Sequence, residues 1–248
     1  MDLFVPGCMW SKNLESEIYN KINMEYGKSS HYEGKQGVEY YEYQNRAAVI
    51  RAKLNARKFT KYIKKSDTVL DFGCGGGWLL AELVCAKKIG VELNKAAHED
   101  CRGNGIEVVS STEEISSLKF DVIISHHCIE HVPYPIAALA CLKDLLKDDG
   151  IFILYLPLDD WRVQKDFSID IDHHLHTWTS RCLANTLRES GFIPSEIRVV
   201  THSWFKGWSL WYSILHPAIF DFMCYLWSVV MKRRQLMAVS KPRSKDSR

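Results

Sequence analysis

The sequence predicts an α/β protein with a doubly wound, mostly parallel sheet of six or seven strands. Three observations lead to this prediction. Short apolar runs recur along the chain with the composition of strands that are buried on both faces. Segments with helical spacing of apolar residues separate these runs, as crossover helices do in a parallel sheet. A run of glycines directly follows the first strand, which is typical of a loop that binds a nucleotide-like ligand.

The glycine-rich stretch carries the first candidate site. Residues 69–72 are predicted to form a strand, and residues 78–83 begin a helix whose free N–H groups point back at the ligand. Gly73 and Gly75 allow the backbone to turn sharply and to approach a ligand closely. Asp71 lies near the end of the strand, where a buried acid is costly without a partner. The stretch therefore predicts a ligand-binding edge, with a simple turn between two core elements as the alternative.

A second acid, Glu92, follows the glycine loop in the next predicted strand, at residues 87–93. A carboxylate at this place accepts the hydroxyl groups of a cofactor's ribose. The Gly-x-Gly-x-x-Gly pattern of dinucleotide-binding loops would need its third glycine at the position of Trp78. This mismatch counts against a nicotinamide-dependent oxidoreductase, which stays an alternative.

A series of motifs in a characteristic order extends from the glycine loop to residue 156. In chain order the motifs are Asp71-x-Gly73-x-Gly75-x-Gly77, Gly90-Val91-Glu92, the predicted strands 106–109 and 120–125, Ile129-Glu130-His131-Val132, the helix and turn from Leu142 to Gly150, and the strand 151–156. Together they resemble the class I S-adenosylmethionine-dependent methyltransferases, in the small-molecule branch (methyltransferase types 11 and 23) that includes quinone-biosynthesis methyltransferases. The resemblance implies a Rossmann-like fold.

The resemblance also implies S-adenosyl-L-methionine as the cofactor and a role for each matching residue. Asp71 would anchor the ammonium group of the methionine part, Glu92 would accept both ribose hydroxyls, and Leu93 would lie against the adenine. The full set of cofactor-binding residues that it implies is Asp71, Phe72, Gly73, Cys74, Gly75, Glu92, Leu93, Ser111, Thr112 and His126. Because the cofactor is a sulfonium cation, acids at two successive strand tips suit it.

Four residues are candidates for acid–base work beside the methyl group: His127, Glu130, His131 and His174. A histidine suits a general base because its pKa lies near neutrality. Glu130 could orient a histidine or hold a metal, and His131 has a purely structural role as its alternative. The three histidines within residues 172–176 also raise the question of zinc, but they lack a nearby cysteine and two of them are adjacent, so no metal site is predicted.

Domain organisation follows from changes of composition along the chain. We predict an N-terminal helical lid (1–44), an S-adenosylmethionine-binding domain (45–202), an aromatic helical extension (203–234) and a disordered basic tail (235–248). Tyrosines and glycines at 32–43 suit a lid over a flat ligand such as a purine, with ordinary surface packing as the alternative.

Further elements are predicted at the ends of these segments. Apolar residues with helical spacing predict helices at 11–30 and 46–63. Thr179 or Ser180 is expected to cap a helix that stops at Gly191. Residues 193–200 form a sixth predicted strand, and the sequence pattern yields no convincing seventh.

The extension is unusually aromatic, and Lys232-Arg233-Arg234 follows it directly. Pro217 and Asp221 interrupt the apolar run, which counts against a membrane-spanning helix. An interfacial hairpin is favoured, with aromatic residues at the headgroup level and basic residues on anionic lipid. A helical cap packed on the sheet or in a dimer interface is the alternative.

The composition limits the possible binding partners and the cellular compartment of the protein. The chain has 248 residues and a net charge of +2, so it lacks the basic signature of a nucleic-acid-binding protein. Eight scattered cysteines, without a Cys-x-x-Cys pair, indicate reduced thiols. We therefore predict a cytoplasmic monomer or homodimer that does not bind nucleic acid, with peripheral contact at the inner face of a membrane as an extension of this prediction.

These observations predict S-adenosylmethionine-dependent methyl transfer to a small or lipid-linked acceptor. O-methylation of a sugar or a phenolic hydroxyl is preferred, and C- and N-methylation stay open. The alternatives are a nicotinamide-dependent oxidoreductase and a non-catalytic binding protein on the same fold. Nucleic-acid modification is disfavoured because the Asn/Asp-Pro-Pro-Tyr/Phe motif is missing after the fourth predicted strand.

Overall fold

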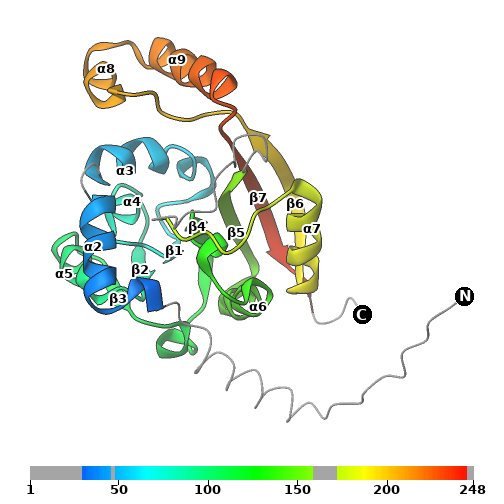
Figure 1. The fold of residues 1–248 in the computed structure, drawn as a ribbon. Helices are drawn as coiled ribbons and strands as arrows, with labels where there is room; N and C mark the ends of the chain where they lie inside the picture. The colour runs from blue at the N-terminus through cyan, green and yellow to red at the C-terminus, as the bar shows by residue number, and fades with distance from the viewer. Residues whose placement is uncertain (1–29, 46–47, 159–171, 245–248) are drawn as a thin grey trace, which may run out of the picture.

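The computed structural model describes residues 30–45, 48–158 and 172–244. A seven-stranded sheet with the order β3-β2-β1-β4-β5-β7-β6 forms its centre, and β7 is antiparallel to both of its neighbours (Figure 1). The other neighbouring pairs are parallel. The predicted Rossmann-like, mostly parallel sheet is thereby confirmed, with seven strands rather than six.

The strands are β1 (Thr68–Phe72), β2 (Lys87–Val91), β3 (Glu107–Val109), β4 (Phe120–His126), β5 (Leu146–Leu158), β6 (Phe192–Val200) and β7 (Arg234–Pro242). The α-helices are α2 (Gly34–Asn45), α3 (Ala48–Ala56), α4 (Trp78–Ala81), α5 (His98–Gly103), α6 (Pro135–Leu145), α7 (Ser180–Glu189), α8 (Trp208–Ile214) and α9 (Pro217–Val230). Short 3-10 turns are η1 (Ser30–Tyr32), η2 (Thr60–Tyr62), η3 (Lys95–Ala97), η4 (Thr112–Ile115) and η5 (Ile129–His131).

Strand β5 shows why the sheet is covered on both faces. From Ile151 to Leu158 its residues form an unbroken apolar run, so successive side chains enter opposite cores. Phe152 and Leu154 belong to the core that contains residues of α6 and α7. Ile153 and Tyr155 belong to the other core, which contains residues of α3, α4 and α5. A strand that is buried on both sides in this way holds the two layers together.

Strand β7 corrects the predicted domain boundaries. Residues 234–242 were expected to lie at the end of the extension and in a disordered basic tail, yet they form the strand between β5 and β6. The apolar residues of β7 are buried, and Leu236 and Met237 lie in the two opposite cores. The sequence pattern missed this strand because its apolar run is short and lies between basic residues. The methyltransferase sheet therefore does not end at residue 202.

The aromatic extension is consequently an insertion between β6 and β7. Its helices α8 and α9 lie together beyond one end of the sheet, next to α3 (Figure 1). Phe220 and Cys224 of α9 are buried in a small third core with Leu54 of α3. Arg57 and Asp221 add an ion pair at 2.9 Å. Across the described ranges, none of the helices combines the length and the apolar character that crossing a bilayer requires.

Several predicted boundaries shift. The helix after the glycine loop is a single turn, because it ends at Ala81 instead of extending to Leu83. The helix predicted over 46–63 is α3 followed by η2. Strand β5 begins at Leu146, earlier than expected, and its register with β4 shifts near that start.

The prediction of helix α7 is confirmed. Thr179 accepts the N–H of Cys182 at 3.1 Å as its cap, and Gly191 follows the helix with φ 84°. The helix predicted at 11–30 lies almost wholly outside the described residues.

The position of β7 makes its side chains decisive for stability. Replacing Leu236 with alanine should lower the free energy of unfolding by about 2–5 kcal/mol, because a fully buried side chain is removed between two layers. Replacing the exposed Lys241 of the same strand should change it by less than about 0.5 kcal/mol. Urea denaturation measures both values, and equal small effects would mean that the segment is not part of the sheet.

Candidate functional site

A cavity of about 430 Å³ lies where β1, β2, β3 and β4 end. The strand order places the carboxyl ends of these four strands in one row, and the direction of winding reverses between β1 and β4, where open α/β sheets bind ligands. Every residue predicted to bind the cofactor lines this cavity: Asp71, Phe72, Gly73, Cys74, Gly75, Glu92, Leu93, Ser111, Thr112 and His126. The structure thus brings the whole predicted set together.

The glycine loop passes close under the cavity. Gly73 has φ 80°, and a Cβ atom there would collide with the Sγ atom of Cys128. Gly75 has φ 53°, and its N–H donates to Oε2 of Glu92 at 2.8 Å. Because α4 is only one turn long, the binding groups here are this loop and the nearby carboxylates rather than the N-terminus of a helix.

Asp71 is a buried carboxyl group in β1. It is 3% exposed, and its Oδ1 atom lacks a hydrogen-bond partner among the described residues. Burial raises the pKa of Asp71 to about 8, and the negative charge of Glu92 adds to this rise. A cationic group of a ligand in the cavity would restore the charged form, because an opposite charge lowers the pKa of an acid.

Glu92 is held in place by the backbone. Its Oε1 and Oε2 atoms accept the N–H groups of Asn94 and Gly75, each at 2.8 Å. Burial raises the pKa of Glu92, and these N–H donors partly offset the rise. Each carboxylate oxygen keeps a second lone pair for a hydroxyl donor, so the side chain is oriented to accept a diol.

Two residues of α3 complete the polar lining and were missed in the sequence. Arg51 and Asn55 line the cavity, and the Nε atom of Arg51 and the Oδ1 atom of Asn55 are buried without hydrogen-bond partners in the described structure. Their separation of one helical turn places both on one face of α3, which was the available signal. With Asp71 opposite in charge to Arg51, the cavity suits the ammonium and carboxylate groups of an amino acid.

Helix α2, in the segment predicted as a lid, contributes to the lining of the cavity. Tyr40, Tyr41 and Gln44 line the cavity from this helix. The helix is fastened to the cofactor loops, since Trp78 Nε1 donates to Asn45 Oδ1 at 2.9 Å and Asn94 Nδ2 donates to the carbonyl of Gly37 at 2.7 Å. The tyrosines therefore do more than pack on the surface, and burial raises the pKa of Tyr40 and Tyr41.

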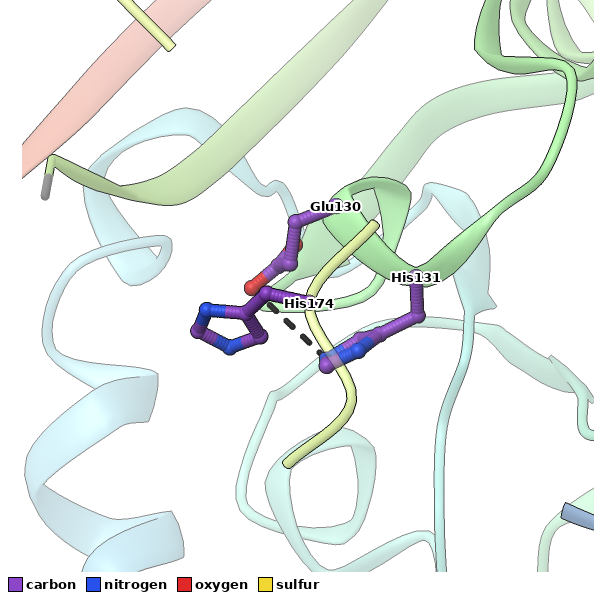
Figure 2. A group of neighbouring side chains, drawn as sticks. All are labelled: Glu130, His131 and His174. Carbon is purple, nitrogen blue, oxygen red and sulfur yellow. Dashed lines mark ion pairs between the residues drawn. The ribbon is translucent and has the colours of Figure 1, made fainter. Parts of the chain in front are cut away.

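The four catalytic candidates also come together, at the end of β4. Glu130 is fully buried on η5, and its Oε1 atom lies 3.5 Å from His127 Nδ1 and 3.9 Å from His131 Nε2. His174 lies against His131, with 4.9 Å between ring centroids (Figure 2). His127 has φ 54°, a left-handed conformation that is costly for a residue with a Cβ and clusters at functional sites. Burial lowers the pKa of His131, and the nearby Glu130 partly offsets this.

Backbone hydrogen bonds explain how a distant histidine reaches this group. The N–H groups of Leu175 and His176 both donate to the carbonyl of Glu130, at 3.0 and 3.1 Å. His176 Nε2 also lies 2.9 Å from the carbonyl of Val132. The segment that begins at 172 is thereby fixed along η5, which the sequence could not reveal.

His126 has an unexpected neighbour. Its Nε2 atom lies 2.9 Å from Lys58 Nζ, which also donates to Gln235 of β7 at 3.1 Å. Burial lowers the pKa of Lys58 to about 7, and burial together with Lys58 lowers the pKa of His126 well below its usual value. The orientation of His126 therefore depends on Lys58, which follows α3, and through Lys58 on Gln235 of β7.

Together, the fold and the cavity suit a ligand that combines an amino acid with a nucleoside. Asp71 suits its ammonium group, Glu92 its ribose diol and Arg51 its carboxylate. The glycine loop leaves room for the part of the ligand that joins these groups. The comparisons with known proteins agree. A family model described as "Methyltransferase domain" matches residues 40–196, more than half of the chain. The chain belongs to this family, and it is a class I methyltransferase with S-adenosylmethionine as its cofactor.

Individual relatives share only part of the chain. A stretch of 94 residues is 38% identical to the ubiquinone biosynthesis O-methyltransferase of Nitrosococcus oceani, and it covers 33% of this chain and 40% of that protein. The chain therefore matches less than half the length of this relative.

Solved structures extend the similarity of fold. An S-adenosylmethionine-dependent methyltransferase from Archaeoglobus fulgidus has a TM-score of 0.59 at 19% identity, over 82% of this chain and 99% of that one. A possible histamine N-methyltransferase from Thermotoga maritima has a TM-score of 0.57 at 21% identity, over 84% and 99%.

Asp71 predicts a pH dependence of cofactor binding. Its carboxyl group is protonated in the free protein below about pH 8 and must lose the proton to hold an ammonium group. The affinity for S-adenosylmethionine should therefore improve roughly tenfold from pH 6 to pH 7 and level off above pH 8. Calorimetry on Asp71→Asn should show weaker binding without this slope, whereas the exposed Asp148→Asn should keep it. A slope that survives in Asp71→Asn would exclude Asp71 as its origin.

Proposed function

We propose that the protein transfers the methyl group of S-adenosylmethionine to a hydroxyl oxygen of a small acceptor. One observation carries the proposal: the cofactor cavity continues along the row of strand ends to His127 and His131, which line it beside the end of β4. With adenine at the end of β3, ribose at β2 and methionine at β1, the methyl group would face these histidines. A hydroxyl acceptor needs a base in this place, and an imidazole suits that need.

The reaction is an in-line displacement at the methyl carbon. The acceptor oxygen forms the new C–O bond while the C–S bond breaks and its electron pair stays on sulfur, which leaves S-adenosylhomocysteine. His127 would take the hydroxyl proton. The rest of the catalysis is alignment of the two substrates by Asp71, Glu92 and the α2 lid. His131 and Glu130 would help to position the acceptor.

The acceptor class follows from this base and from the relatives. Ubiquinone biosynthesis O-methyltransferases match about a third of the chain at modest identity, and a phenolic hydroxyl is our preferred acceptor, with a sugar hydroxyl as the second choice. Membership of the methyltransferase family argues against the alternative of a nicotinamide-dependent oxidoreductase. A non-catalytic binding protein stays the competing hypothesis, and the next experiment separates it from an enzyme.

Replacement of His127 provides the test of transfer. Asparagine tolerates the left-handed backbone of this position. With S-adenosylmethionine labelled in its methyl group and a panel of phenols, catechols and sugars, His127→Asn should lower kcat by about 10²–10⁴-fold and leave the cofactor Kd unchanged. Label found only on amines, or no transfer by the native protein to any acceptor fraction of a cell extract, would refute O-methylation.

We also propose that the α8–α9 hairpin rests on a membrane surface, which would bring a lipid-linked acceptor to the site. The hairpin exposes apolar side chains on the outside: Leu210, Trp211, Ile214, Ile219, Phe222, Tyr225, Leu226, Val229 and Val230. Exposed basic residues stand at both of its ends, Lys206 on one side and Lys232, Arg233 and Arg234 on the other. Such an apolar patch with a basic rim suits anionic lipid.

Flotation with vesicles tests this contact. The intact chain should float with vesicles that contain phosphatidylserine, less so in high salt. Phe222→Asp and Val230→Asp should remain at the bottom of the gradient, because each places a charge in the exposed apolar face. Val84→Asp changes a similarly exposed valine outside the hairpin and should float like the native protein. Identical behaviour of the hairpin variants and the native chain would reject lipid contact. A truncation at His202 is unsuitable, since it would remove β7.

A further inference from the structure

We propose that Glu130, His131 and His174 hold a divalent transition-metal ion such as Zn²⁺ or Mn²⁺, and that this ion binds an acceptor with two neighbouring oxygens, such as a catechol or a vicinal diol. The inference deepens the proposed O-methylation and rests on it for the identity of the acceptor. The binding of the ion itself depends only on these three side chains, which Figure 2 shows together.

The three residues offer one ligand atom each within 4.8 Å of one another, which is the spacing of ligands around a common ion. One carboxylate and two imidazoles form a mixed oxygen and nitrogen donor set that suits Zn²⁺ and other first-row divalent ions. A set of three protein ligands leaves coordination positions open, as in catalytic metal sites.

The state of Glu130 is the second, independent observation. Its side chain is fully buried, and both of its carboxylate oxygens lack hydrogen-bond partners among the described residues. A buried carboxylate without hydrogen bonds is strongly destabilising unless a cation compensates its charge. The ring nitrogens of His127 and His131 lie 3.5 and 3.9 Å from Glu130 Oε1, too far for good hydrogen bonds. A metal ion is the cation that fits between Glu130 and the rings.

Hydrogen bonds orient the ring of His131 and hold the segment that carries His174 in the way that is typical of metal ligands. His131 Nδ1 lies 3.3 Å from the carbonyl of His173, so it carries the proton and leaves Nε2 with a free lone pair on the side of Glu130. Metal-binding histidines use this arrangement, in which the second ring nitrogen donates to a carbonyl. The two backbone bonds from Leu175 and His176 to Glu130 hold the 172–176 segment, and with it His174, beside the carboxylate.

The site also has access to the reacting groups. His131 belongs both to this group and to the lining of the cofactor cavity, at the end that we assign to the methyl group. Two acceptor oxygens on the ion would fill its open positions. The ion would lower the pKa of the bound hydroxyl. Its proton passes to His127, the oxygen then attacks the methyl carbon, and the oxidation state of the metal does not change.

Metal binding by the full chain tests the inference without an activity assay. After treatment with a chelator and dialysis, the native protein should bind one equivalent of Zn²⁺, as measured by competition with a chromogenic chelator. Glu130→Gln and His174→Ala should bind it at least about tenfold more weakly. His173→Asn is the matched control, because its side chain stacks on His31 outside the group and asparagine tolerates its φ of 53°. This variant should bind Zn²⁺ like the native protein.

Co²⁺ distinguishes this site from binding by cysteines. The cobalt protein should show the visible bands of nitrogen and oxygen ligands without the strong charge-transfer band of a thiolate, and Glu130→Gln should lose these bands. Equal Zn²⁺ affinity in all variants, or a thiolate band in the native protein, would overturn the inference. Calorimetry with S-adenosylmethionine on the same samples keeps the two proposals apart: cofactor binding without Zn²⁺ binding refutes the metal site alone, and Zn²⁺ binding without cofactor binding refutes the proposed function alone.

Discussion

Carboxyl groups at the ends of neighbouring strands are the constraint on which the rest of this structure depends. Asp71 in β1, Glu92 after β2 and Glu130 after β4 all lie in one row, each removed from bulk water by the fold. Only Glu92 has its charge supported by backbone N–H donors. Burial of unsupported acids costs stability, and the fold can bear that cost only if cationic ligands are part of its working state. A sulfonium cofactor with an ammonium group is a ligand of this kind.

The scaffold that holds these acids is closed by its last strand. Strand β7 fills the gap between β5 and β6, so both cores depend on residues from the end of the chain. It also reaches the site, because Gln235 accepts from Lys58, which orients His126. The α8–α9 insertion can therefore vary in its surface while the strands on either side of it stay fixed.

The periodic patterns and the glycine loop predicted the sheet, and the order of the motifs predicted the cofactor-binding residues. These features could be predicted because each is encoded by residues that are close together in the sequence. Strand β7 was not predicted because its four consecutive apolar residues are flanked by basic residues and resemble part of a basic tail. Its burial comes from pairing with β5 and β6, which no local signal carries. His174 was named from its residue type and from the place of its segment after the fifth predicted strand, whereas its position beside Glu130 depends on two backbone hydrogen bonds across more than forty residues of chain. Arg51 was missed because its helix resembled an ordinary amphipathic one.

The two halves of the site are joined through Asp172. Tyr32 of the lid region donates to its carbonyl at 3.2 Å, and Gln44 of α2 donates to its Oδ1 atom at 3.2 Å. The same α2 helix is hydrogen-bonded through Asn45 to Trp78, the first residue of α4, and through Gly37 to Asn94, which caps η3. The segment that carries His174 is thus tied to the helix that covers the cofactor. Since ordering a lid costs conformational entropy, a cofactor that orders α2 would also order the acceptor side, and the second substrate would meet a site that is already formed.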